Sequence, residues 1–234
     1  MTRLYSDLCH ADTRYWLEVL ADKSIEPRKY KEAMTEVGRR LGDSILSKID
    51  DVQGDVYLAC TVEDADFLAK GMLSSLEKHL SKISFACFWN ERFSPFEIED
   101  LKVAPILKKY QEPTSKNIKY LIVLKSIISG ACVVRTNLVN LIQKIEPEQI
   151  FIAAPIIYKH AEQKLKDEFE KKIYDKFQLF YFAKDDERTC EGEVIPGIGG
   201  NIYLRLCFEG QSHKNEYIPE IVIARRSQFI NRNS

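Results

Sequence analysis

The stretch that decides the fold is Tyr120–Val134, YLIVLKSIISGACVV. It opens with an unbroken apolar run, residues 120–124, which is typical of a buried parallel strand, and it leads into a helix expected from about Val133 to Ile145. A turn of small residues lies between them. This geometry presents backbone N–H groups to an anion at a helix N-terminus. The alternative is an ordinary strand-to-helix turn, capped by Ser129 and packed tightly at Gly130 and Ala131.

The same two periods alternate along the rest of the chain. Apolar residues at steps of three and four predict a helix over 27–49, and a charged helix is expected over 160–174. Short apolar runs predict strands at 55–60, 83–89, 103–107, 149–154 and 177–182. Strands that alternate with helices indicate an α/β protein with a mainly parallel sheet and helices on both faces.

We expect one domain over residues 1–234, because no internal repeat or low-complexity segment is present. Residues 1–26 are expected to form an N-terminal extension, and residues 184–234 a C-terminal hood. Within the hood, Tyr203–Phe208 and Ile218–Ala224 are predicted to be short strands. Residues 90–100 are expected to be irregular, and residues 232–234 to be a frayed end.

Composition excludes several classes of function. Lys plus Arg is 34 and Asp plus Glu is 35, so the net charge of −1 argues against a protein that grips nucleic acid along its whole length. Neither a signal peptide nor an apolar run long enough to cross a bilayer is apparent, so we expect a cytoplasmic protein with no membrane partner. The six cysteines, three of them (Cys60, Cys87 and Cys207) in apolar strand-like runs, form no C-x-x-C pair; we expect free thiols and no metal site.

Ligands of open parallel sheets bind beyond the carboxyl ends of the strands. Four such places are residues 61–66, residues 125–135, residues 155–158 and the loop after Phe182. The first carries Glu63, Asp64 and Asp66, and the second begins at Lys125. Three carboxylates at the first place would repel a phosphate unless a metal intervened; the alternative is that they stabilise a helix N-terminus.

Four segments resemble the uracil phosphoribosyltransferases, which have the type I phosphoribosyltransferase fold. They occur in that family's order and span roughly residues 28–210: Tyr30–Leu41 (YKEAMTEVGRRL), Leu121–Ala131 (LIVLKSIISGA), Phe177–Glu187 (FQLFYFAKDDE) and Val194–Gly199 (VIPGIG). The last is the most specific, since it resembles the family's Pro-Gly-Leu-Gly segment, whose backbone recognises the edge of uracil.

The resemblance implies three groups of binding residues, without assigning any catalytic residue. Residues of the phosphoribosyl-diphosphate motif would bind phosphate and ribose: Lys125, Ser126, Ser129, Gly130 and Ala131. The loop for the diphosphate would supply Thr61 and Glu63, with Arg92 contributed from the family's mobile loop. The base would be bound by Ile195, Gly197, Ile198 and Gly199.

This sequence departs from the family at the positions that matter for transfer. Lys125 and Ser126 stand where the family has acidic residues near the ribose hydroxyls, and an ammonium group has only donors to offer them. Cys132 and Val133 replace glycines of the phosphate cradle and narrow the approach to its backbone. The acidic positions after the base-binding segment are also absent, and only Arg205 is retained there.

We therefore expect a degenerate homologue that has lost transfer and keeps the scaffold to bind a nucleotide-like ligand, a protein or nucleic acid. Divergent proteins of this kind also occur as effectors in bacterial antiviral modules such as retrons, which is an analogy. The alternative is an active enzyme that makes UMP and diphosphate from uracil and phosphoribosyl diphosphate with Mg²⁺, Lys125 contacting phosphate. A third hypothesis is a structural subunit of a homo- or hetero-oligomer, because the family usually dimerises; no cofactor is expected unless the protein is active.

Overall fold

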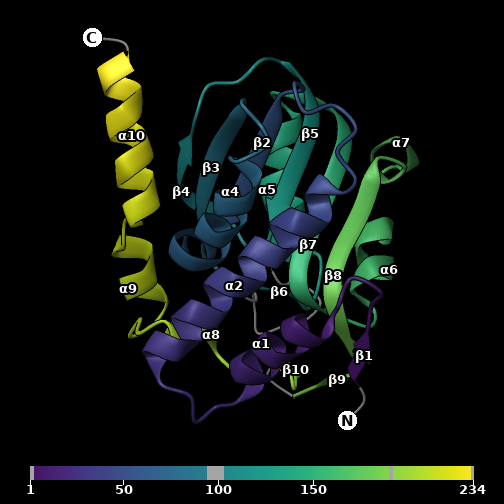
Figure 1. Ribbon diagram of the computed structural model, residues 1–234, viewed down its shortest axis with the longest axis vertical. Coiled ribbons are helices and arrows are strands. Elements are labelled where there is room, and N and C mark those ends of the chain that lie inside the picture. Colours follow the sequence, from purple (N-terminus) through teal and green to yellow (C-terminus); the bar gives the residue numbers. More distant parts are fainter. Residues whose placement is uncertain (1–2, 94–102, 190–191, 233–234) are drawn as a thin grey trace.

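The computed structural model describes residues 3–93, 103–189 and 192–232, and its elements alternate along most of the chain (Figure 1). The strands are β1 (Arg3–Tyr5), β2 (Val56–Thr61), β3 (Ile83–Asn90), β4 (Ile106–Gln111), β5 (Asn117–Leu124), β6 (Ile127–Ile128), β7 (Glu146–Tyr158), β8 (Phe177–Asp185), β9 (Glu187–Arg188) and β10 (Val194–Ile195). The helices are α1 (Ala11–Ala21), α2 (Pro27–Leu46), α3 (Val62–Asp64), the π-helical turn η1 (Ala65–Ala69), α4 (Lys70–Leu76), α5 (Cys132–Ile142), α6 (Ala161–Asp167), α7 (Lys171–Tyr174), α8 (Ile202–Arg205), α9 (Gln211–Glu216) and α10 (Glu220–Arg232).

The main sheet has the strand order β1-β8-β7-β5-β2-β3-β4, and the short β6 continues beside β7. The strands from β8 to β3 are parallel, whereas β1 and β4 run antiparallel at the two edges. The register of β2 with β5 pairs Cys60 with Leu124. The carboxyl ends of β2 and β5 therefore meet at the same edge of the sheet, and the loops that follow them lie side by side.

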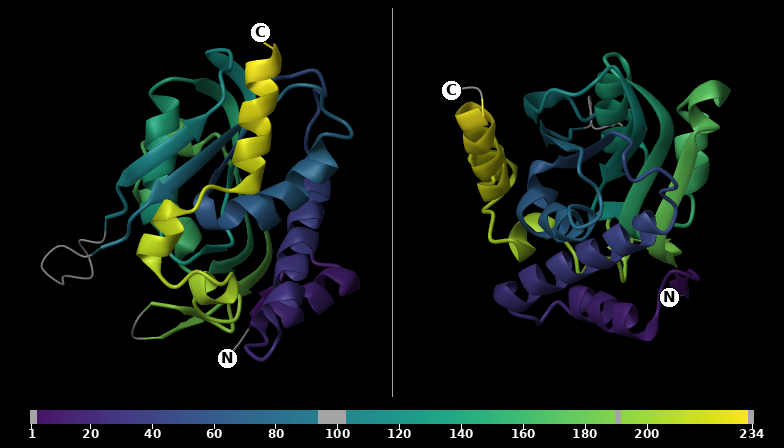
Figure 2. Two further views of the ribbon diagram at one scale, coloured as in Figure 1. Left: turned by 90° about the vertical axis from the view of Figure 1, so that its left-hand side faces the viewer. Right: turned by 45° about the horizontal axis from the view of Figure 1, so that its top comes forward.

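Helices cover both faces of the sheet, as the sequence predicts (Figure 2). One core lies between the sheet and the helices α2 and α4, with Tyr30, Met34 and Leu41 of α2 fully buried in it. The second core lies under α5 and α6, where Leu138 and Leu165 pack on the opposite face of the sheet. Because both faces are covered, β2 is buried along its whole length and β5 from Tyr120 to Leu124.

The first 26 residues contribute two elements for which the sequence analysis made no prediction. Strand β1 pairs with β8, and Arg3 binds the buried carboxylate of Asp185 through Nε and Nη2, each at 2.8 Å. Helix α1 packs on α2, with Leu17 and Leu20 completely buried. This segment therefore packs on the core of the protein.

Two predicted strands of the hood are wrong. Tyr203–Phe208 contains α8, and most of Ile218–Ala224 is the first half of α10, which runs along one side of the molecule in both figures. Cys207, predicted to be buried in a strand, is exposed and has a positive φ of 69°. The strand predicted at 103–107 begins three residues later, at Ile106, and the predicted helix over 160–174 is broken into α6 and α7.

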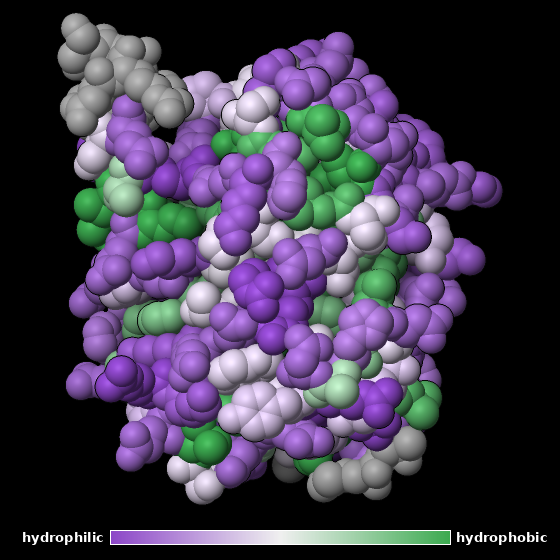
Figure 3. All heavy atoms as spheres, in the orientation of Figure 1, coloured by the Kyte–Doolittle hydropathy of each residue, from purple (hydrophilic) through white to green (hydrophobic). Residues whose placement is uncertain are grey.

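Of the described residues, Cys9, Cys60, Cys87 and Cys207 are free thiols. Cys190, the prediction for residues 94–100 and that for residues 233–234 lie outside the described part. Figure 3 shows a mostly hydrophilic face with scattered hydrophobic spots. Within residues 3–93, 103–189 and 192–232, no helix has the length and hydrophobicity needed to cross a membrane.

Candidate ligand site

The lysine at the end of β5 is buried in an ion cluster. Lys125 is 4% exposed and its ammonium group makes three hydrogen bonds: to Thr61 Oγ1 at 2.7 Å, Glu63 Oε1 at 2.9 Å and Asp64 Oδ2 at 2.6 Å. Since an ammonium group has three N–H donors, all of its donors are used within the protein. The register of β2 with β5 makes this contact, because it places Thr61 and the acids after it beside Lys125.

The charges in this cluster hold one another ionised. Burial alone would raise the pKa of Glu63, but the positive charges of Lys125, Lys214 and Arg92 outweigh it and hold that pKa at about 2. Burial would lower the pKa of Lys125, whereas Asp64 and Glu63 raise it above its ordinary value. The cluster is therefore an internal ion pair at neutral pH.

The two aspartates after β2 have further partners. Asp64 also accepts hydrogen bonds from Thr61 Oγ1 at 2.7 Å and from the backbone N–H of Ser126 at 3.1 Å. Asp66 accepts from the hydroxyl of Tyr217 and from the backbone N–H groups of Glu220 and Ile221, at 3.0 and 2.9 Å. Asp66 thus caps α10, a helix that begins more than 150 residues later in the chain.

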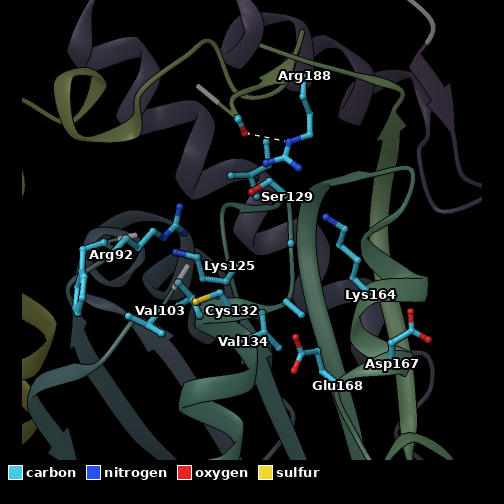
Figure 4. A pocket seen from close by; sticks show the side chains of 16 residues that line it. Arg92, Val103, Lys125, Ser129, Cys132, Val134, Lys164, Asp167, Glu168 and Arg188 are labelled. Carbon is cyan, nitrogen blue, oxygen red and sulfur yellow. Dashed lines mark hydrogen bonds between the residues drawn. The ribbon is translucent and has the colours of Figure 1, made fainter. Parts of the chain in front are cut away.

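A cavity of about 860 Å³ opens beside the ion cluster, in front of the N-terminus of α5 (Figure 4). Among the described residues no side chain caps this helix, and its first residues, Cys132, Val133 and Val134, line the cavity. A Cβ atom built on Gly130 would meet no atom within 4 Å, so the turn is open on the cavity side, without the tight packing at Gly130 considered above. The backbone N–H groups at the start of a helix attract an anion.

Basic side chains surround this opening. Arg92 and Lys164 come from opposite sides, and Arg188, whose Nε donates to the carbonyl of Gly192 at 3.2 Å, comes from the hairpin of β9 and β10 (Figure 4). Two acids of α6 and its end, Asp167 and Glu168, also line the cavity. Glu168 is paired with Arg135 at 3.0 Å, and Asp167 accepts a hydrogen bond from Gln163 at 2.7 Å. Among the charged residues that line this cavity, the four basic ones (Arg92, Lys125, Lys164 and Arg188) therefore outnumber the two acids.

A second, smaller cavity of about 320 Å³ adjoins the first and shares Arg92, Lys125 and Ser129 with it. Its walls come from the end of β5 and from the hood. They are lined by Glu63, Arg92, Lys125, Ser126, Ile127, Ser129, Gly192, Glu193, Val194, Ile198, Gly200, Asn201, Ile202, Tyr203 and Gln211. The two cavities together form one cleft at the carboxyl edge of the parallel strands.

The structure brings together most of the predicted site residues. Those that line the cleft are Glu63, Arg92, Lys125, Ser126, Ser129, Gly130, Ala131 and Ile198, and Thr61 lies beneath it on Lys125. Among the residues that the structure describes, Ile195, Gly197 and Gly199 do not line it. Gly197 instead donates its N–H to Asp185 at 2.8 Å and accepts from Arg3 at 2.8 Å. The carbonyl of Ile198 is likewise taken, by the hydroxyl of Tyr30 at 3.0 Å.

Several cleft residues escaped the sequence analysis. Lys164, Arg188, Tyr203 and Gln211 are scattered along the chain, and only their places after strand ends or in the hood connect them. Arg205, which the resemblance retains, lies elsewhere: it donates to the carbonyls of Asp22 and Lys23 at 2.9 and 2.8 Å and covers the ring of Tyr30. It fastens the hood to the loop between α1 and α2.

The donor set does not fit a magnesium ion. Within the described residues, no three His, Cys, Asp or Glu side chains are grouped as metal ligands. The two carboxylates nearest the cleft, Glu63 and Asp64, are already neutralised by Lys125. A divalent cation at this place would have to compete with the ammonium group that they hold.

Neither a protein-family model nor a curated protein sequence matches this chain. Among solved structures, the AQ2163 protein of Aquifex aeolicus is similar over 88% of this chain and 99% of its own, with a TM-score of 0.68 and 14% identity. The hypoxanthine-guanine phosphoribosyltransferase of L. donovani (TM-score 0.40, 11% identity, 70% of this chain and 82% of its own) overlaps less. So does the adenine phosphoribosyltransferase of Thermoanaerobacter pseudethanolicus (0.37, 6%, 63% and 80%). At these identities the likeness to the AQ2163 protein is one of fold alone, and the chain has a mixed, mostly parallel eight-stranded sheet with helices on both faces.

Proposed function

We propose that this protein binds a phosphorylated, nucleotide-like ligand without transferring a phosphoribosyl group. The observation that carries the proposal is the uncapped N-terminus of α5, which opens into a cavity of about 860 Å³ beside Arg92, Lys164 and Arg188. A helix N-terminus with nearby cations favours a phosphate. The adjoining smaller cavity is where the remainder of the ligand would lie.

The contacts of Lys125 support the absence of transfer. Phosphoribosyl transfer depends on positioning the ribose and stabilising the departing diphosphate. Here the place that the resemblance gives to ribose-binding acids holds Lys125, whose donors are bound to Thr61, Glu63 and Asp64. These contacts also count against the alternative in which Lys125 binds phosphate in an active uracil phosphoribosyltransferase.

Calorimetric titration with ribose 5-phosphate and with UMP tests the binding site. We expect both to bind, and Gly130→Asp to weaken both by about tenfold or more, because a carboxylate before α5 would repel the phosphate. Gly130→Ala is the matched control and should bind as the unmodified protein does, since a Cβ at this position meets no atom within 4 Å. Equal affinities in the aspartate and alanine variants would place the phosphate elsewhere.

A transfer assay tests the second half of the proposal. Labelled uracil, hypoxanthine and adenine are each incubated with phosphoribosyl diphosphate and Mg²⁺. We expect no labelled nucleotide with any of them. Turnover that disappears in Lys125→Ala would instead establish the active enzyme.

A further inference from the structure

Glu63, which lines the smaller cavity, has one buried carboxylate oxygen whose hydrogen bonding is incomplete. Glu63 is 6% exposed; its Oε1 accepts from Lys125 at 2.9 Å, while its Oε2 has no hydrogen-bond partner among the described residues. The residue lines the cavity that adjoins the proposed phosphate site. Leaving a buried charged oxygen without a partner is costly, so a group that satisfies it gains affinity.

The chemistry of that oxygen restricts what can lie against it. Glu63 is ionised at neutral pH, because Lys125, Lys214 and Arg92 outweigh the effect of burial on its pKa. An ionised carboxylate only accepts hydrogen bonds. A ligand N–H or amino group would complete it, whereas a carbonyl oxygen at the same place would be repelled.

The remaining walls suit a flat ring. The half-buried Tyr203 lines the cavity, and the ammonium group of Lys214 lies 5.3 Å from the centre of its ring. The backbone N–H of Tyr203 donates to Asn201 Oδ1 at 2.9 Å. Ile198 and Ile202 add apolar surface. Apolar and aromatic walls with one well-placed polar group are typical of sites that bind a heterocycle and fix its orientation.

We infer that Glu63 selects the ring of the bound nucleotide, favouring one that presents an amino group over one that presents a carbonyl oxygen at that place. This inference rests on the proposed function, because it assumes that the phosphate of the same ligand lies at α5. The residue acts on specificity by binding and takes no part in a chemical step.

Two matched pairs of ligands test the inference by calorimetry. CMP carries an amino group where UMP carries a carbonyl, and AMP carries one where IMP has a carbonyl; in each pair the neighbouring ring nitrogen also changes, from an acceptor in the amino member to an N–H in its partner. We expect the amino member of at least one pair to bind with an affinity at least about tenfold higher than that of its partner, because it gains a hydrogen bond to a charged group. Equal affinities within both pairs would overturn the inference.

The variant Glu63→Gln tests the residue itself. Its carbonyl can keep the contact with Lys125 while its amide nitrogen takes the place of Oε2, so the site becomes a donor and the preference should reverse toward UMP or IMP. Glu193→Gln removes the other carboxylate that lines the cavity and should leave the preference unchanged. A preference that changes only in the Glu193 variant would contradict the assignment to Glu63.

Ribose 5-phosphate separates the two levels of the argument. If it binds while both nucleotide pairs show no preference, the selection by Glu63 is wrong and the phosphate site stands. If ribose 5-phosphate and all four nucleotides fail to bind, the proposed function is wrong and the inference fails with it. The amino preference of the unmodified protein remains decisive even if Glu63→Gln does not fold.

Discussion

Lys125 Nζ and Asp64 Oδ2 are 2.6 Å apart, although 61 residues separate them in the chain. The two residues follow neighbouring parallel strands, β5 and β2, and both side chains are buried. Where the resemblance implies a bound substrate with Mg²⁺, this protein has an ion pair between two of its own loops. The ion pair thereby ties together the two loops that contribute Glu63, Lys125 and Ser126 to the wall of the cleft.

Removing the ammonium group of Lys125 should lower the free energy of unfolding. Lys125→Met leaves Glu63 and Asp64 buried without their cation, and breaking a buried ion pair costs about 3–5 kcal/mol. Urea denaturation followed by circular dichroism measures the change in the free energy of unfolding. The control is Lys116→Met, because Lys116 and its partner Glu146 are both exposed. For this variant we expect the free energy of unfolding to change by less than about 1 kcal/mol. A small loss in Lys125→Met would show that the buried cluster contributes little.

Stability should fall in acid, and Glu63 should account for part of the fall. Because the folded protein holds the pKa of Glu63 at about 2, below its ordinary 4.5, the unfolded chain takes up the proton first as pH decreases. The contribution, about 3 kcal/mol, is fully present above pH 4.5 and is lost between there and pH 2. Unfolding curves at stepped pH should therefore show a shallower decline in Glu63→Gln. Parallel declines in the two proteins would contradict this assignment.

Asp66→Asn should loosen the C-terminal helix selectively. The change weakens the cap on the N–H groups of Glu220 and Ile221, and losing an N-cap costs about 0.5–2 kcal/mol. Hydrogen exchange in residues 217–232 should quicken while the central strands stay protected. The fluorescence of Trp89, whose indole N–H donates to the carbonyl of Tyr217 at 2.8 Å, gives a second readout. Asp12→Asn, which removes an exposed acid, should leave both measurements unchanged.

Substitution of Gly130 and of Gly199 should have different effects on the thermal midpoint of unfolding. Gly130→Ser should leave the thermal midpoint nearly unchanged, because a Cβ there meets open space. Gly199→Ala should lower it, because Gly199 has φ +78° and an added Cβ would lie 2.3 Å from the carbonyl oxygen of Leu20. A strained backbone of this kind costs about 1–3 kcal/mol. Calorimetric unfolding of the two variants provides the comparison.

The parallel sheet could be predicted from the sequence because its central strands are short apolar runs. The helices between them are recognised by apolar residues that recur every three or four positions. The same reasoning failed in the hood. The mostly apolar run Tyr203–Phe208 looks like a strand, yet its first half belongs to α8, in which Asn201 caps the N–H of Tyr203. Likewise α10 begins just after Pro219 and is capped by Asp66, a partner more than 150 residues away that no local pattern reveals.

The candidate site shows the same division. The turn before α5 and the positions of Thr61, Glu63 and Lys125 followed from strand ends, which all lie at one edge of a parallel sheet. That Lys125 binds Thr61 and the acids after it depended on the register of β2 and β5, and a register is not apparent from one sequence. Arg188 and Lys164 reach the cleft only through the three-dimensional packing of their elements.

The three hydrogen bonds that Asp66 accepts determine when, during synthesis of the chain, the acidic loop can become fully bonded. The loop that carries Glu63, Asp64 and Asp66 leaves the ribosome early, but its partners are synthesised later: first Lys125, and last the segment from Tyr217 to Ile221. A nascent chain that ends before residue 217 therefore has the sheet but not the capped helix that secures the acidic loop. Ligand binding should appear only when nearly the whole chain has emerged.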